Sequence, residues 1–404
     1  MAKVRKAAVN FIFITLLIDV IGFGIIIPVL PDLLSEMMDI GINDASKFGG
    51  YLLFAFAIPQ FLFSPLFGNL SDRYGRRPII LLSLFGFTID YLLLALAPSY
   101  WWLVLGRIIA GFFGASHTTA AAYIADISTD KDRSKNFGMI GAAFGMGFII
   151  GPLIGGVLGT FGLRLPFYVA AALTFLNFLY GYFILPESLS LENRRQFKWR
   201  DANPLTTLVK LSRYKQIGVL FIAYFLLYLG SHAVQSNWTY FTMYRFEWSQ
   251  WMVGISLAVV GVLVGVVQAV LAQRAADKFG LNRSIIWGFA LYTTGMLLFA
   301  FANASWMMFV FLVPYCLGGI ASPNLLALMT SQVPENQQGE LQGGLTSLAS
   351  ITTIIGPVMM TGIFYYFTTD TAPFHFPGSA FFLGGIFMLI SYLIVYYFLR
   401  DRKA

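Results

Sequence analysis

The segment at residues 68–77, GNLSDRYGRR, separates two long apolar runs at 51–67 and 78–97. Two membrane helices joined by so short a charged turn must lie antiparallel and close together at one face of the membrane. The glycines permit close backbone approach, Asp72 can cap a helix start, and the arginines favour the cytoplasmic side. Charge alone indicates a positive-inside loop between any two membrane helices, but this spacing of Gly, Asp and Arg is more specific.

Composition places the chain among the membrane proteins that cross the bilayer many times. Its 404 residues are 58% hydrophobic and 11% charged, with a mean hydropathy of +0.73, whereas a soluble domain carries about 25% charged residues. Nearly uncharged stretches recur, each close to the ~20 residues that one crossing needs. We predict an all-α membrane protein of twelve spans, near 8–30, 48–69, 78–97, 100–125, 137–160, 164–185, 217–240, 250–273, 284–303, 305–331, 340–367 and 377–399.

The net charge of +7 follows membrane topology and does not indicate nucleic-acid binding. With both termini inside, 22 of the 26 Lys and Arg residues fall in cytoplasmic segments, which is the positive-inside bias. The solitary Cys316 excludes an internal disulfide and any metal site built from cysteines. We expect a plasma-membrane protein (the bacterial inner membrane), with both termini in the cytoplasm.

An internal repeat divides the spans six and six. Shifting the second half back by 205 residues aligns 72–75 with 277–280, and the Gly-Pro pair at 151–152 with the pair at 356–357. Two parallel six-helix halves imply a binding site near the bilayer midplane, opened when one half rocks against the other. The predicted parts are an N-terminal half at 1–185, a cytoplasmic linker at 186–216 and a C-terminal half at 217–404.

Four ionisable residues are predicted within the spans of the first half. Asp19 shares a helical face with Thr15, and a carboxylate near mid-bilayer costs at least about 2.5 kcal/mol, so it should face the protein interior. Asp90 is a second intramembrane carboxylate, placed nearer the outer interface. Arg107 must find a carboxylate or an anionic ligand, and Asp19 and Asp90 are the candidates. A structural ion pair is the alternative to proton transport. His117 suits proton handling if it is wet, although a packed histidine explains it equally well.

A glycine-rich run marks the fifth predicted span. It contains Gly145, Gly151, Pro152, Gly155 and Gly156. Glycines at this density indicate close helix contact, and the proline adds a kink or hinge. The alternative is generic tight packing. The run is no nucleotide-binding loop, because it lies inside an uncharged span with no strand beside it.

Polar residues along the seventh predicted span indicate a solute path. His232, Gln235, Ser236 and Thr239 recur at helical spacing on an otherwise apolar helix. Satisfied polar packing is the alternative. If the stripe lines a path, aromatic walls would suit a planar or amphipathic solute. The further substrate-binding candidates are Trp238, Phe241, Gln60, Gln268 and Asn324.

Nearly the whole chain resembles the major facilitator superfamily of transporters, in its tetracycline efflux branch of drug/proton antiporters. The turn at 68–77 is similar to the superfamily's loop 2–3 signature, and the glycine spacing at 145–156 resembles its antiporter signature. The segments LIDVIGFGIIIPVLPDLL, GNLSDRYGRRP, DYLLLALAP, LGRIIAG, AAAYIAD and GPLIGG all resemble that branch, in its order.

The resemblance implies roles for individual residues. Those matching Asp19, Asp90 and Arg107 are linked to substrate and proton transport in the family. Two departures concern the second half: the family's eighth-span histidine would fall near Val264, and its ninth-span aspartate near Tyr292. Since both are tied to coupling with a metal–tetracycline complex, tetracycline itself is in question. A charged cluster that latches the halves is implied at Gly68, Asp72, Arg73, Gly75, Arg76 and Asp126.

These observations predict a proton-coupled exporter of a small amphipathic, drug-like molecule. A proton symporter or uniporter for a metabolite is the first alternative, and a non-transporting membrane sensor the second. An enzyme is not expected, because no nucleophile–base pair or metal cluster is apparent. We expect a monomer in the lipid bilayer that uses the proton gradient and needs no cofactor or metal.

Overall fold

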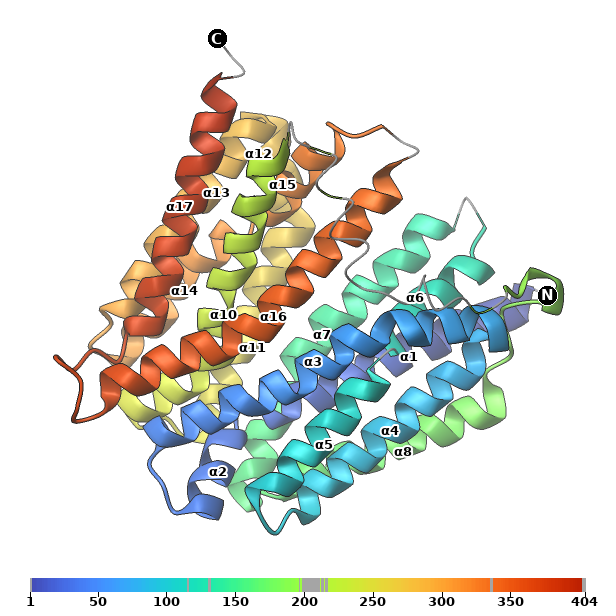
Figure 1. Cartoon of the computed structure of the whole chain (residues 1–404), viewed down its shortest axis with the longest axis horizontal. Coiled ribbons are helices and arrows are strands. Elements are labelled where there is room, and N and C mark those ends of the chain that lie inside the picture. Colours follow the sequence, from blue (N-terminus) through green and yellow to red (C-terminus); the bar gives the residue numbers. More distant parts are fainter. Residues whose placement is uncertain are drawn as a thin grey trace. The chain divides into compact units, whose positions relative to one another are not determined.

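The computed structural model describes residues 2–114, 116–129, 132–195, 197, 211, 214, 217–334 and 337–401, and these form helices and loops without a β-strand (Figure 1). Twelve helical spans within them are long and apolar enough to cross a membrane, which confirms the predicted fold class and number of spans. The helices are α1 (Ala2–Ile26), α2 (Leu30–Met38), α3 (Ile42–Tyr74), α4 (Arg76–Leu96), α5 (Tyr100–Phe113), α6 (Ser116–Ile127), α7 (Arg133–Phe161), α8 (Leu165–Ile184), η1 (Leu191–Asn193), α10 (Gly218–Phe246), α11 (Gln250–Val266), η4 (Val267–Leu271), α12 (Ala272–Phe279), α13 (Leu281–Ala300), α14 (Ser305–Gly318), α15 (Ala321–Thr330), α16 (Gln338–Thr368) and α17 (Ser379–Asp401).

The internal repeat is visible in where the helices begin. The helices α4, α5, α6 and α7 start at residues 76, 100, 116 and 133, and α13, α14, α15 and α16 start 205 residues later, at 281, 305, 321 and 338. The repeat-related Gly75 (φ 107°) and Gly280 (φ 81°) both have backbone angles that L side chains rarely adopt. Both precede a helix start, where a side chain would strain the backbone.

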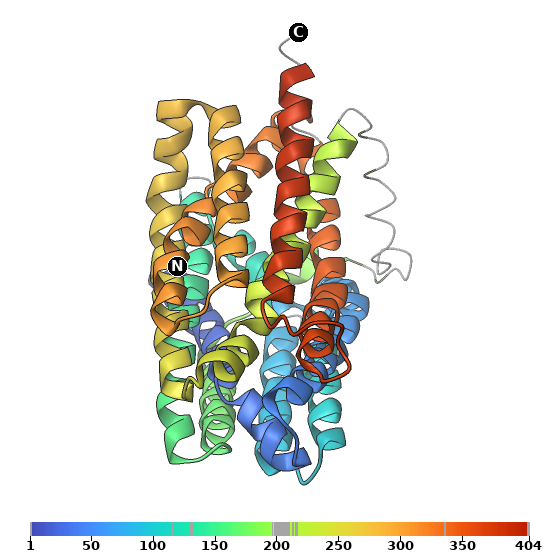
Figure 2. The same cartoon turned by 90° about the vertical axis from the view of Figure 1, so that its left-hand side faces the viewer.

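The chain forms two units, each with its own helix packing. The first unit contains 1–40, 55–204 and 249–258, and the second contains 41–54, 205–248 and 259–404. In the first, α1 packs on α7 and α8, and α4 packs on α5, α6 and α8; in the second, α10 packs on α16 and α17, and α13 packs on α14, α15 and α17. The helix α17 (red) runs beside α10 in both views (Figures 1 and 2). These matching contacts repeat one six-helix arrangement twice.

Two short segments belong to the unit formed mainly by the other half of the sequence. The first turns of α3 lie in the second unit, where Gly49 abuts the hydroxyl of Tyr240 and Gly50 abuts Thr361. Residues 249–258, at the start of α11, lie in the first unit. Of the predicted linker 186–216, the structure describes 186–195, 197, 211 and 214, and its role as a linker stays a prediction.

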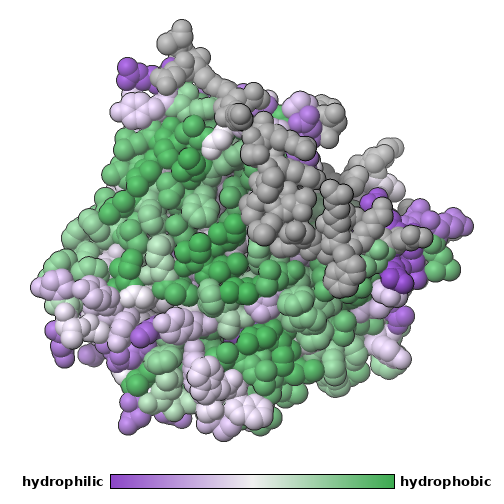
Figure 3. Space-filling view, in the orientation of Figure 1, coloured by the Kyte–Doolittle hydropathy of each residue, from purple (hydrophilic) through white to green (hydrophobic). Residues whose placement is uncertain are grey.

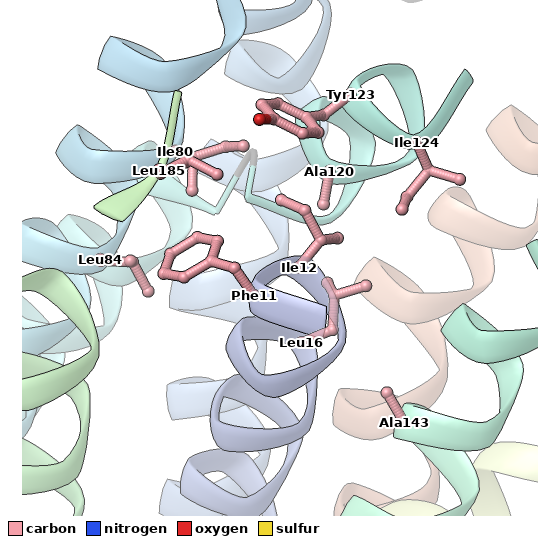
Figure 4. Close-up of a cluster of buried hydrophobic side chains, with 10 residues drawn as sticks. All are labelled: Phe11, Ile12, Leu16, Ile80, Leu84, Ala120, Tyr123, Ile124, Ala143 and Leu185. Atoms are coloured by element: carbon pink, nitrogen blue, oxygen red, sulfur yellow. The ribbon is translucent and has the colours of Figure 1, made fainter. Parts of the chain in front are cut away.

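Apolar side chains fill the interior and also cover the outward faces of the helices. In the first unit, a buried cluster joins α1, α4, α6 and α7 (Figure 4). On the surface, apolar residues cover the visible face of α17, with hydrophilic residues near its end (Figure 3). Helices that are apolar on both sides are expected where the surrounding solvent is lipid. The buried cluster consists of Phe11, Ile12, Leu16, Ile80, Leu84, Ala120, Tyr123, Ile124, Ala143 and Leu185.

Candidate functional site

A buried ion pair joins α4 to α5 inside the first unit. The guanidinium of Arg107 donates to both carboxylate oxygens of Asp90, through Nη2 and, at 3.2 Å, through Nε. Asp90 is fully buried and Arg107 is 7% exposed. A Cβ on Gly106 would lie 2.9 Å from Oδ1 of Asp90, so the glycine leaves room for the pair. The sequence suggested Asp19 or Asp90 as the partner of Arg107, and in the structure the partner is Asp90.

The other carboxylate, Asp19, lies on α1 close to this pair. Tyr91, next to Asp90, points its hydroxyl at α1, within 2.6 Å of where a Cβ on Gly22 would be. Asp19 lies less than one turn before Gly22, is partly buried, and acts electrostatically on Tyr91. On the same helix Thr15 donates to the amide oxygen of Asn177 on α8 at 3.3 Å. The three ionisable groups therefore belong to one polar region where α1, α4 and α5 meet.

His117 lies in α6, and its side chain is outside the described residues. Gln60 of α3 donates to the carbonyl of Gly114, directly after α5, at 3.4 Å. Also between α5 and α3, Cζ of Arg107 lies 6.0 Å from the ring centroid of Phe56.

The charged turn between α3 and α4 gathers the residues predicted for the latch. Arg76 pairs with Asp72 at 2.5 Å and with Asp126 of α6 at 3.2 Å, and also donates to Ser71 at 2.6 Å. Arg73 instead lies over the ring of Tyr74, and Gly68 has open space around it. The structure thus brings Asp72, Arg76 and Asp126 together, and Arg76 bridges the two carboxylates.

Glu187, which follows α8, is a member of this cluster that sequence reasoning missed. Its carboxylate accepts the backbone N–H groups of Arg76 at 2.8 Å and Arg77 at 3.2 Å, so it caps the start of α4. The next residue, Ser188, donates to Asp126 at 2.9 Å. The available signal was an acidic residue directly after a proline at a span end, but its partner lies 111 residues away.

The glycine run of α7 packs against two different helices. A Cβ on Gly151 would clash with Gly24 of α1, and one on Gly155 would clash with the carbonyl of Ile25. On the neighbouring face, a Cβ on Gly156 would lie 2.7 Å from the carbonyl oxygen of Gln250 at the start of α11. Pro152 lies inside α7 and packs on both partners, whereas Gly145 has nothing within 4 Å.

A hydrogen bond also holds the start of α11 within the first unit. The side-chain amide of Gln250 donates to the carboxylate of Asp32 on α2 at 2.7 Å. Burial raises the pKa of Asp32, and the hydrogen bond from Gln250 partly offsets this.

In the second unit, the stripe predicted on α10 is mostly buried. His232 packs on Gly356 of α16 and lies 3.4 Å from Thr352, and Ser236 donates to the carbonyl of His232. Thr239 is also buried, whereas Gln235 is exposed. The two aromatic candidates, Trp238 and Phe241, are each 1% exposed and pack edge-on against Phe381.

The remaining candidates lie near a helix irregularity. Gln268 is exposed on the π-helical turn η4, a feature frequent at functional sites. Asn324 of α15 is buried and donates to the carbonyl of Ala272, just beyond that turn, at 3.4 Å. Tyr292, where the family's aspartate was expected, packs its ring against Gly318 and Tyr315. Within the described residues, no three His, Cys, Asp or Glu side chains are grouped to hold a metal ion.

Comparisons with known proteins agree with this arrangement. The family model of the Major Facilitator Superfamily matches residues 12–274 and 220–404. The chain is 41% identical to the class C tetracycline resistance protein of Escherichia coli, over 87% of this chain and 88% of that protein. It is 36% identical to the class H tetracycline resistance protein of Pasteurella multocida, over 99% of this chain and 98% of that protein.

Among solved structures, the fold is similar to that of the human organic anion transporter MFSD10 (TETRAN). The TM-score is 0.72 with 23% identity, covering 97% of this chain and 99% of the other. Fold, spans and sequence relatives therefore agree, and the chain belongs to the Major Facilitator Superfamily, in the branch of the tetracycline resistance proteins.

Proposed function

We propose that this secondary transporter of the drug-efflux type exports a small amphipathic molecule in exchange for protons, by alternating access. The observation that carries this proposal is the buried Asp90–Arg107 pair beside Asp19. Ionisable groups inside a membrane span are costly and mark ion or proton pathways. Sequence identity with tetracycline resistance proteins, which extends over most of the chain, supports export of a drug-like solute.

In this proposal Asp19 carries the coupling proton. Its neighbour Asp90 is already held in the ion pair with Arg107. Asp19 is partly buried on α1 close to that pair, and a carboxyl group inside a membrane span is typical of proton pathways. Rocking of the halves changes this burial, so a proton taken up in one access state is released in the other.

The cluster around Arg76 acts as the conformational latch. Arg76 bridges two carboxylates, and Glu187 fixes the helix start that carries Arg76. These groups lie outside the polar region at Asp90, so they influence the rate of switching and do not contact the solute. Loss of Asp72 should slow turnover without removing binding.

Polar amide side chains in each half are our candidates for contacts with the solute. In the first half, Gln60 donates to the carbonyl of Gly114, directly after α5. In the second half, Gln268 lies on the π-helical turn η4, Asn324 lies beside it, and Gln235 is exposed on α10. Amide side chains offer both donors and acceptors, which suits an amphipathic solute with carbonyl and hydroxyl groups.

The protein acts as a monomer in a bacterial inner membrane, with both termini and the Asp72 turn in the cytoplasm. The positive-inside distribution of Lys and Arg supports this orientation. Its energy source is the proton gradient, and it needs no cofactor or resident metal.

The decisive experiment measures substrate-driven proton movement in proteoliposomes with a pH dye. Asp19→Asn mimics the permanently protonated carboxyl, so it should abolish uphill export and spare downhill solute exchange. Asp39→Asn, at an exposed position after α2, is the matched control for the loss of one charge. Uphill export by Asp19→Asn would refute the assignment of the proton to Asp19. Solute and proton moving in the same direction in the parent protein would favour a symporter.

The solute is identified by a thermal-shift screen that includes tetracycline with and without Mg²⁺. The relatives are named for tetracycline resistance, but the histidine and aspartate expected for a metal–tetracycline complex would fall near Val264 and Tyr292. We therefore expect stabilisation by a metal-free amphipathic solute. Stabilisation only by tetracycline together with Mg²⁺ would contradict this.

A further inference from the structure

The two repeat-related glycine turns differ in how their charges are neutralised. In the first unit, Arg76 follows Gly75 and pairs with two carboxylates. The residue 205 positions later is Leu281, which follows Gly280 and has no charge. Asp277, the counterpart of Asp72, accepts a hydrogen bond from Gln273 at 2.9 Å instead. The second turn therefore keeps the geometry of the first without its internal ion pairs.

Three basic residues surround this second turn. Arg274 and Lys278 lie one helical turn apart on α12, and Arg283 lies in the first turn of α13. All three are exposed, and none of them forms an ion pair in the part of the chain that the structure describes. One nearby carboxylate, Asp277, leaves an excess of positive charge on this surface.

Large aromatic side chains flank the same cations. Phe279 is 51% exposed, and Nζ of Lys278 lies 5.5 Å from its ring centroid. Trp287 is 65% exposed and follows Arg283 by one turn of α13, on the same face. Tryptophan is enriched at the boundary between the acyl chains and the head groups. Because α12 ends one span and α13 begins the next, this turn lies at a membrane surface.

We propose that Arg274, Lys278 and Arg283 form a binding site for the head group of an anionic phospholipid. Basic clusters next to a membrane span attract anionic lipids, and guanidinium groups form two-pronged contacts with phosphate. Trp287 and Phe279 lie against the glycerol and upper acyl region of the same lipid. Charge complementarity selects this occupant: unpaired cations at a membrane surface face a phosphate, and exposed aromatic rings face its hydrocarbon.

The test uses the full-length protein in nanodiscs that contain brominated phosphatidylglycerol or brominated phosphatidylcholine. Bromine quenches tryptophan fluorescence at close range, and subtracting the signal of Trp287→Phe isolates the contribution of Trp287. Each cation near an anionic surface favours binding about fivefold. Three such cations together correspond to about a hundredfold. The variant with Arg274, Lys278 and Arg283 all replaced by Gln should lose at least about tenfold of this preference for phosphatidylglycerol.

A charge-matched control separates a site from general attraction. Replacing Lys135, Arg195 and Arg400 by Gln removes three exposed cations elsewhere, and it should leave quenching of Trp287 unchanged. Equal quenching in the parent and the Arg274/Lys278/Arg283 variant would overturn the proposal, as would an equal loss in the control. Displacement of phosphatidylglycerol by inorganic phosphate would assign the site to a soluble anion and would also overturn it. Since the readout is lipid binding, it is independent of transport.

Discussion

Removing the carboxylate of the buried ion pair tests the central feature of the first unit. In Asp90→Asn, the guanidinium of Arg107 stays inside the protein without its negative partner. At an effective dielectric constant of about 20, unit charges separated by the observed 3.2 Å interact by about 5 kcal/mol. Breaking a buried pair from one side costs about 3–5 kcal/mol. We expect a loss of stability of this size.

The chain contains a natural reporter for the measurement. Cys316 is the single cysteine of the sequence and is 2% exposed, so a thiol-reactive dye labels it only when the protein unfolds. Asp90→Asn and Arg107→Gln should each lower the unfolding temperature clearly. The double variant should be more stable than the sum of the two losses predicts, because no buried charge is left unpaired. Asp39→Asn is the control for one exposed charge.

The reasoning fails if Asp90→Asn unfolds at the parent temperature, since the pair would then contribute nothing measurable. It also fails if the losses of the two single variants add in the double variant, because the groups would then act independently. Gly106→Ala provides a check from the geometry. Its Cβ would crowd the Asp90 carboxylate at 2.9 Å, so it should weaken the pair without changing any charge.

Three further predictions follow from contacts outside this pair. Burial raises the pKa of Asp32, so the folded state binds this proton more tightly and stability falls as pH rises through that pKa. Asp32→Asn keeps a partner for Gln250 and should raise the unfolding temperature near neutral pH. The difference in unfolding temperature between this variant and the parent should shrink in acid. A difference in unfolding temperature that grows in acid would contradict this. Gly155→Ala should lower the free energy of unfolding by about 1–3 kcal/mol, because its Cβ would clash with α1. Gly145→Ala has open space around it and should leave stability unchanged in the same thiol assay. Equal losses of stability in the two variants would refute the packing argument. Glu187→Ala removes the acceptor for two N–H groups of α4 and should cost about 0.5–2 kcal/mol, and unchanged stability and turnover would exclude it from the latch.

The sequence by itself determined the twelve spans, the repeat and the family. These properties are local or periodic: an apolar run of sufficient length must form a helix in lipid, because unpaired backbone groups are too costly there. The offset of 205 residues that aligns the motifs also separates the starts of four helices in the first half from those in the second. The turn at Asp72 and its approach to Asp126 followed from one motif and the expectation that spans two and four are neighbours.

Tertiary structure decided which side chains meet. The sequence suggested two carboxylates as partners for Arg107. Only the packing of α4 on α5, with Gly106 between them, shows that the partner is Asp90. Glu187 escaped notice because its partners lie 111 residues away on another helix. The sequence suggested Trp238 and Phe241 as aromatic walls of a solute path, but in the structure they pack on α13 and α17. Helix periodicity tells which residues share a face, whereas the neighbour of that face depends on how all the helices pack together.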